Sequence, residues 1–237
     1  MAESRSRSHK TARGSYVPAN STSAFCPLPS DFPGWRYTAV LVSGAAAIGF
    51  RSKTGRAIAV AVAGPPKAPE LLWRCEIALI DPAVPETAEP YHQVMELPWE
   101  QAIVAVRPSV ARIESVARTA LASLIRELAS GGWTVRAVGV VGSPDRSLQR
   151  IGNEHIRAHA AEGILFRRVL ESAAEHHHLK CVGLSEKQLG QASLELGAVA
   201  DVAAHLKALG RQAGAPWRVD ERAAATAAWL ALVSGQG

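Results

Sequence analysis

The chain has 237 residues, 48% hydrophobic and 20% charged, which is ordinary for a globular domain with a substantial core and excludes a fibrous or wholly disordered protein. Residues 1–30 hold four basic residues and one acidic residue, so they carry +3 of the formal net charge of +5 and leave only +2 for the other 207 residues. This near-neutral remainder gives little support for a large phosphate-binding surface.

The first third of the chain predicts an extension followed by strands. Residues 1–36 are rich in serine, arginine, proline and asparagine and show no hydrophobic period, so we expect a disordered basic extension and then a single domain over residues 37–237. Residues 38–50 are small and apolar. Residues 51–56 have the composition of a polar turn. Two strand candidates follow, at residues 57–63 and 71–80, and their short connections predict an antiparallel set. A Pro- and Glu-rich loop comes next, at residues 82–98.

The rest of the chain alternates helices and strands. Apolar residues recur at helical spacing through residues 109–130, and Gly131-Gly132 ends that helix. Asn153 is placed to cap a long helix that ends near His176. The other expected elements are a buried parallel strand at residues 135–141, a strand at 179–184, a helical stretch at 186–209 and a final helix from Val219.

This order predicts an α/β domain with a mixed sheet, in which an antiparallel three-strand unit is followed by parallel strands and helices cover both faces. The order, together with the segment AIGFRSKTGRAIAVAV at residues 47–62, resembles the ribonuclease H-like superfamily and more particularly its RuvC-type resolvase branch. The resemblance covers roughly residues 44–233. It implies a nucleic-acid partner and a divalent-cation site, with Mg²⁺ or Mn²⁺ as the expected ion.

Members of that superfamily hold their cations with carboxylates from the first strand, the central region and the last helix, because each hard cation takes several oxygen ligands. The last-helix position matches Asp220, with Glu221 beside it. The resemblance therefore implies that, in an enzyme, Asp220 and Glu221 are metal ligands and that both acids are catalytic. The first-strand acid is missing, because Arg51 stands in that region, and Asp145 lies just beyond the acid-free strand at residues 135–141.

The helix after Asn153 carries a second constellation. His155, His159 and Glu162 fall within roughly 60° of one another on a helix, on the side that becomes apolar in later turns. Polar groups on a buried face need partners. Three interpretations stay open: a local hydrogen-bond network or solvated helix end, a ligand or phosphate contact, and a metal site. In an enzyme we expect Glu162 as a metal ligand and catalytic group, His155 as a metal ligand, and His159 as a proton carrier or an extra ligand.

Two classes of function follow. One is a divergent metal-dependent nuclease or nucleic-acid-processing protein, and the alternative is a binding or scaffold module that kept the fold and lost catalysis. A sugar- or nucleotide-handling relative with the same sheet would need phosphate-binding loops, and residues 139–142 match neither GxGxxG nor a P-loop.

The location of the protein is predicted from what its sequence lacks. No apolar run is long enough to cross a bilayer, and no apolar stretch follows the basic N-terminus as it would in a secretory signal. Cys26, Cys75 and Cys181 are too scattered for a zinc cluster and odd in number for a disulfide framework, so we expect reduced thiols. Arginine outnumbers lysine by 20 to 6, as in bacteria whose genomes are rich in G and C. We therefore expect a bacterial, cytoplasmic protein that does not bind membranes.

Overall fold

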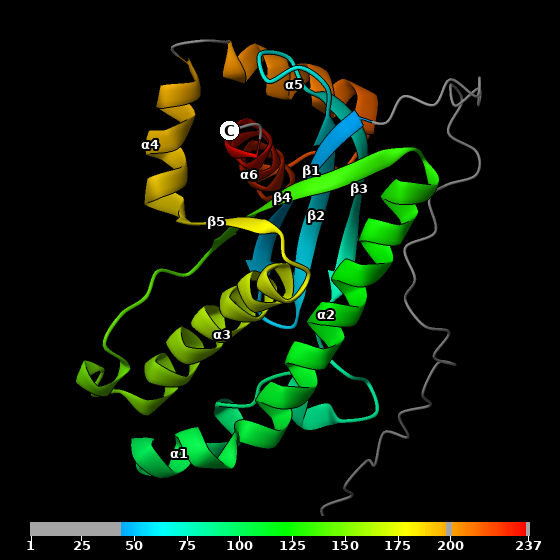
Figure 1. The fold of residues 1–237 in the computed structure, drawn as a ribbon. Coiled ribbons are helices and arrows are strands. Elements are labelled where there is room, and N and C mark those ends of the chain that lie inside the picture. Colours follow the sequence, from blue (N-terminus) through cyan, green and yellow to red (C-terminus); the bar gives the residue numbers. More distant parts are fainter. Residues whose placement is uncertain (1–43, 198–200, 236–237) are drawn as a thin grey trace, which may run out of the picture.

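Five strands form one mixed sheet in the computed structural model, which describes residues 44–197 and 201–235 (Figure 1). The strands are β1 (Gly44–Lys53), β2 (Arg56–Ala63), β3 (Glu70–Ala78), β4 (Trp133–Gly142) and β5 (Lys180–Ser185). They lie in the order β3-β2-β1-β4-β5, with β1, β2 and β3 antiparallel and β1, β4 and β5 parallel. This topology confirms the predicted ribonuclease H-like sheet. The predicted extension over residues 1–36 lies outside the described residues.

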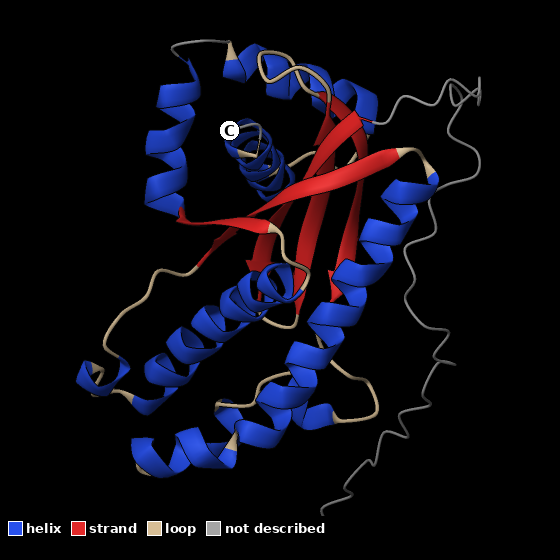
Figure 2. Cartoon of the chain, viewed as in Figure 1, coloured by secondary structure: helices blue, strands red, loops and turns tan. Residues whose placement is uncertain are grey.

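Helices cover both faces of this sheet (Figure 2). The helices are α1 (Trp99–Ala105), α2 (Arg107–Ser130), α3 (Glu154–His176), α4 (Glu186–Gly197), α5 (Val202–Ala213) and α6 (Val219–Ser234), and three short 3-10 turns are η1 (Pro85–Thr87), η2 (His92–Val94) and η3 (Leu148–Arg150). On β1, Ile48 and Phe50 belong to the core that α2 and α3 cover, whereas Ala47 belongs to the core under α6. The alternation along the strand thus builds a core on each face.

Helix α6 lies directly on the centre of the sheet. A Cβ atom at Gly49 of β1 would lie 1.9 Å from the carbonyl oxygen of Ala224, and one at Gly139 of β4 would lie 2.2 Å from that of Ala227. Only glycine permits this approach, because real atoms do not come so close to a backbone oxygen. The approach places the first turn of α6 beside the carboxyl end of β1.

Two predicted elements differ in the structure. The expected turn over residues 51–56 is shorter, because β1 continues through Arg51, which pairs with Ile58 on β2 and Val141 on β4. Backbone pairing on both sides keeps Arg51 in the strand, and Gly55 (φ +74°) supplies the tight turn. The expected helix over residues 186–209 is divided into α4 and α5, and the carboxylate of Asp201 caps α5 by accepting a hydrogen bond from the Ala204 amide at 3.0 Å.

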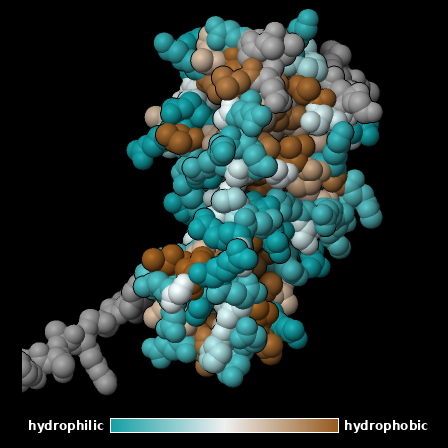
Figure 3. Space-filling view, turned by 90° about the vertical axis from the view of Figure 1, so that its left-hand side faces the viewer, coloured by the Kyte–Doolittle hydropathy of each residue, from teal (hydrophilic) through white to brown (hydrophobic). Residues whose placement is uncertain are grey.

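The surface is mixed in character. Figure 3 shows hydrophilic residues over much of one face, interrupted by separate hydrophobic patches. Among the described residues no helix has the length and apolar character that a membrane crossing requires. Cys75 is buried and Cys181 is partly buried, and Cys26 lies outside the described part of the chain.

Candidate functional site

The first turn of α6 brings Asp220 against two cations of β1. The Lys53 Nζ lies 2.9 Å from Asp220 Oδ1, and the Arg51 Nε lies 3.3 Å from the same oxygen. Arg51 also forms an ion pair with Glu186 at the start of α4. The position where the superfamily has a first-strand acid therefore holds a guanidinium that connects β1 to two helices.

These ion pairs govern the ionisation of Asp220. Partial burial raises the pKa of its carboxyl, but hydrogen bonds and charge attraction from Lys53 and Arg51 outweigh burial and leave the pKa below its ordinary value. The carboxylate is thus ionised at neutral pH, with its charge balanced by side chains of the protein. Arg51 and Lys53 supply the positive charge that faces this carboxylate.

The two other acids near this end of the sheet have partners as well. The Glu221 carboxylate accepts a hydrogen bond at 2.8 Å from the backbone amide of Arg218, one turn earlier, and is buried at the start of α6. Asp145 forms ion pairs with Arg167 and Arg168 of α3, at 2.5 and 3.1 Å. Neither acid belongs to a group of three or more possible metal ligands within the described residues.

The predicted constellation on α3 has a clear local origin. The side chain of Asn153 accepts a hydrogen bond from the Ile156 amide at 2.9 Å and so begins the helix, as predicted. His155 and His159 lie one turn apart and their Nε2 atoms are 3.0 Å from each other. Their rings make an edge contact with centroids 4.4 Å apart. The first turns of α3 therefore present two imidazole nitrogens side by side.

A third histidine joins this pair from η2. The ring centroid of His92 lies 4.3 Å from that of His159 and 5.1 Å from that of His155. One ligand nitrogen from each of the three residues lies within 4.8 Å of the others, which makes them the one group of this kind in residues 44–197 and 201–235. We call His92, His155 and His159 the histidine cluster.

Glu162 lies behind the histidine cluster and orients His92. Its Oε1 atom accepts hydrogen bonds from the Nδ1 of His92 at 2.8 Å and from the backbone amide of the same residue at 3.3 Å. The Glu162 side chain is fully buried and that of His92 is 13% exposed. Because the carboxylate accepts a hydrogen bond from Nδ1–H, the neutral His92 ring has its lone pair on Nε2.

Two atoms in this arrangement have no hydrogen-bond partner among the described residues. They are the Nε2 of His92 and the Oε2 of Glu162, and both are buried. A buried nitrogen with a free lone pair is a costly feature unless something binds it. The orphaned Nε2 belongs to the ring that completes the cluster, and it is the ring nitrogen that Glu162 leaves available for a ligand.

The spacing of the cluster suits a transition metal. Tetrahedral zinc with Zn–N bonds of 2.0–2.1 Å separates two ligand nitrogens by about 3.3 Å, and the His155 and His159 nitrogens are already 3.0 Å apart. A carboxylate that binds the second ring nitrogen of a metal-bound histidine is a recurrent feature of metal sites. Glu162 and His92 stand in that relation.

The structure thus brings together two of the predicted site residues, His155 and His159, and places Glu162 one contact away through His92. It does not bring Asp220 or Glu221 into this group. Sequence reasoning missed His92, because it lies in the Pro- and Glu-rich loop over residues 82–98, where no periodicity marks a buried face. The one feature of the sequence that could have indicated His92 is that it is a histidine, a residue type that occurs eight times in the chain.

Comparisons with solved structures find distant similarities. RuvC of Thermus thermophilus, alone and in complex with a Holliday junction substrate, matches over 78% of this chain and 92% and 90% of its own, with 16% and 13% identity and a TM-score of 0.43 in both. An Aquifex aeolicus member of the Ppx/GppA family matches over 62% of this chain and 37% of its own, with 7% identity and a TM-score of 0.31. No family model and no curated protein matches. The fold assignment therefore stands on the strand order of the chain itself.

Proposed function

We propose that the protein binds one divalent transition-metal ion, zinc in the first place, through His92, His155 and His159, and that it acts through this ion. One observation carries the proposal: three imidazoles from η2 and α3 converge, and the buried Glu162 carboxylate orients the ring of His92, which is the third of them. In this proposal Glu162 supports His92 from behind and is not itself a ligand.

The donor atoms favour zinc over the magnesium or manganese that the family resemblance implied. Imidazole nitrogen suits zinc, copper and nickel, whereas Mg²⁺ prefers oxygen donors and keeps much of its hydration. The cluster offers three nitrogens and no carboxylate oxygen. A hard cation would find better ligands at an acidic site, and Asp220 has its charge balanced by Lys53 and Arg51.

We assign the contacts at the carboxyl end of β1 a structural role. Arg51 ties Asp220 of α6 and Glu186 of α4 to the sheet, and Glu221 caps its own helix. For Asp220 to bind magnesium in a nuclease, the side chains of Arg51 and Lys53 would both have to move away from it. With a net charge of only +2 outside residues 1–30, the chain also offers weak electrostatic attraction to a polyanion, so we propose no nucleic-acid substrate.

Metal titration of the full chain tests this proposal. Calorimetry should detect tight binding of one zinc ion at the cluster. Zinc at 100 times its Kd should stabilise the fold by about 2.7 kcal/mol, which corresponds to a rise in Tm of about 5–10 °C for a chain of this size. Millimolar Mg²⁺ should leave the Tm unchanged. A Tm that responds to Mg²⁺ and not to zinc would overturn the proposal.

A further inference from the structure

The chain between β3 and α1 runs over the helices without joining the sheet. We call residues 81–98 the connecting segment; it contains η1 in its first half and η2 in its second. Within the part of the chain that the structure describes, its backbone hydrogen bonds close on the segment itself, apart from the His92 amide, which donates to Glu162, and the Pro98 carbonyl, which accepts from the first turn of α1. Side-chain contacts therefore decide how the segment lies on the helices.

The first half of the connecting segment is fixed by buried polar groups. The Asp81 carboxylate forms an ion pair with Arg112 of α2. The buried hydroxyl of Thr87 donates a hydrogen bond to the carbonyl oxygen of Val84 at 2.7 Å and accepts one from the Asp81 amide at 2.9 Å. The backbone hydrogen bonds around η1 measure 2.9, 3.0 and 3.1 Å, which is an ordinary length. This half holds its place without an ion.

The second half of the segment is held by longer hydrogen bonds. In η2 the amide nitrogens of Gln93, Val94 and Met95 lie 3.3, 3.4 and 3.5 Å from the carbonyl oxygens that accept from them. Backbone hydrogen bonds in proteins are usually about 2.9–3.0 Å long, so these bonds are weak. A short turn closed by weak bonds has a low free energy of local opening. The side-chain contacts of η2 therefore matter more than those of η1.

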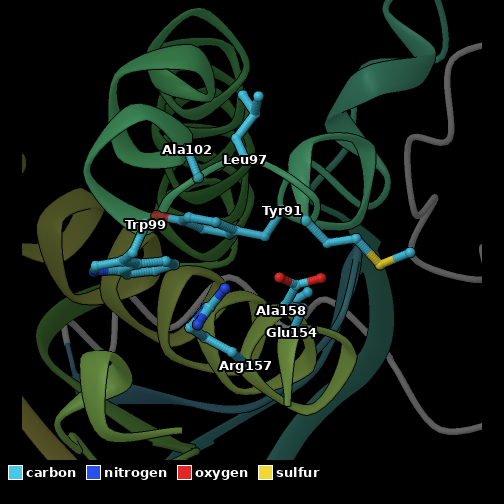
Figure 4. Close-up of a pocket in the computed structure, with 8 residues that line it drawn as sticks. Tyr91, Leu97, Trp99, Ala102, Glu154, Arg157 and Ala158 are labelled. Atoms are coloured by element: carbon cyan, nitrogen blue, oxygen red, sulfur yellow. The ribbon is translucent and has the colours of Figure 1, made fainter. Parts of the chain in front are cut away.

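These side-chain contacts join η2 to the first turns of α3. Figure 4 shows Tyr91 beside Trp99, with Arg157 of α3 close to both; the two ring centroids are 5.6 Å apart, and the guanidinium carbon lies 5.8 Å from the Trp99 ring centre. His92 makes the polar contact, to Glu162, but its buried Nε2 has no partner among the described residues. Opening of η2 exposes this nitrogen to water, so the unsatisfied atom favours the open state while no ligand binds it.

A metal ion at the histidine cluster would reverse this preference. It would be bound by His92 of η2 and by His155 and His159 of α3, so the ion itself would link the two elements. Opening of η2 would then remove one of the three ligands. A ligand shifts a conformational equilibrium by the difference between its affinities for the two states, and here the closed state binds the ion more tightly.

We propose that the ion is a clamp that fastens η2 to α3, so that metal occupancy controls the local opening of residues 92–97. This inference rests on the proposed metal site. Gln93, Glu96 and Leu97 are exposed on this stretch. With the ion bound they form one fixed surface next to His92, and without it they move with η2. The chain thereby converts the presence of zinc into a change of its surface, while η1 keeps its structure.

Hydrogen–deuterium exchange of the full chain, with and without zinc, tests the clamp. Zinc at 100 times its Kd should slow exchange at the amides of residues 93–97 at least about tenfold, because the open state lacks one ligand. The amides of residues 83–88 are the internal reference, and their exchange should change by less than about twofold. His155→Ala removes a ligand from α3 and leaves η2 intact, so it should abolish the slowing at the same zinc concentration. His176→Ala should retain it.

The outcomes separate the clamp from the metal site. Zinc that binds by calorimetry without slowing exchange in residues 93–97 would overturn the clamp and leave the metal site standing. Equal slowing in residues 83–88 and 93–97 would also overturn the clamp, because zinc would then stabilise the whole segment rather than η2. Absence of zinc binding would overturn both proposals, and so would undiminished slowing in the His155→Ala chain, because zinc would then act from another place.

Discussion

A His159→Ala variant should bind zinc at least about 100-fold more weakly than the wild-type chain. The estimate is conservative, because loss of a group that merely supports a ligand costs about 10–100-fold in metal affinity, and His159 supplies one of three direct ligands in the proposed site. Its Nε2 lies 3.0 Å from that of His155, so its removal also leaves that ring without its neighbour. Calorimetric titration of both proteins measures the difference.

His176→Ala is the matched control. His176 is an exposed histidine at the other end of the same helix, and its ring contacts His177. The run His176-His177-His178 could bind zinc weakly without any relation to the cluster, so this variant shows how much of the signal comes from there. Equal losses in His159→Ala and His176→Ala would mean that the titration reports surface histidines.

A Glu162→Gln variant should bind zinc about 10- to 100-fold more weakly, although Glu162 is not a proposed ligand. The substitution keeps the volume of a fully buried side chain and removes its negative charge. Without that charge the Nδ1 proton of His92 is held less firmly, and the Nε2 lone pair is a poorer donor to the metal.

The control for this variant is Glu175→Gln, an exposed acid on the last turns of α3. The zinc-free melting temperatures of both variants should be compared with that of the wild type. A misfolded Glu162→Gln chain would lose zinc affinity because the fold is lost, which says nothing about the role of Glu162 in positioning His92. Unchanged zinc affinity in a folded Glu162→Gln chain would contradict the positioning role of this carboxylate.

The sheet and one face of the site could be predicted from the sequence. The strands follow from short apolar segments between turn residues, and the shared direction of His155, His159 and Glu162 follows from the helical repeat alone. Both are local rules, in which near neighbours in the chain determine the outcome. The confirmed strand order β3-β2-β1-β4-β5 shows how far such rules reach.

The remaining parts depended on packing between distant segments. His92 reaches the cluster because η2 packs on α3, 70 residues further along the chain, and no local pattern in residues 82–98 indicates that contact. Arg51 was expected in a turn, but pairing on both sides keeps it in β1 and directs it to Asp220 and Glu186. The assignment of Asp220 and Glu221 as metal ligands remains a prediction of the family resemblance.

The most direct test of the proposed metal centre is X-ray absorption at the zinc edge, recorded on the zinc-loaded His176→Ala chain. The proposed site predicts three imidazole nitrogens and one further oxygen at about 2.0–2.1 Å from the ion. A shell that contains sulfur, or one with fewer than two imidazoles and mainly carboxylate oxygen, would contradict the proposal that His92, His155 and His159 hold the metal.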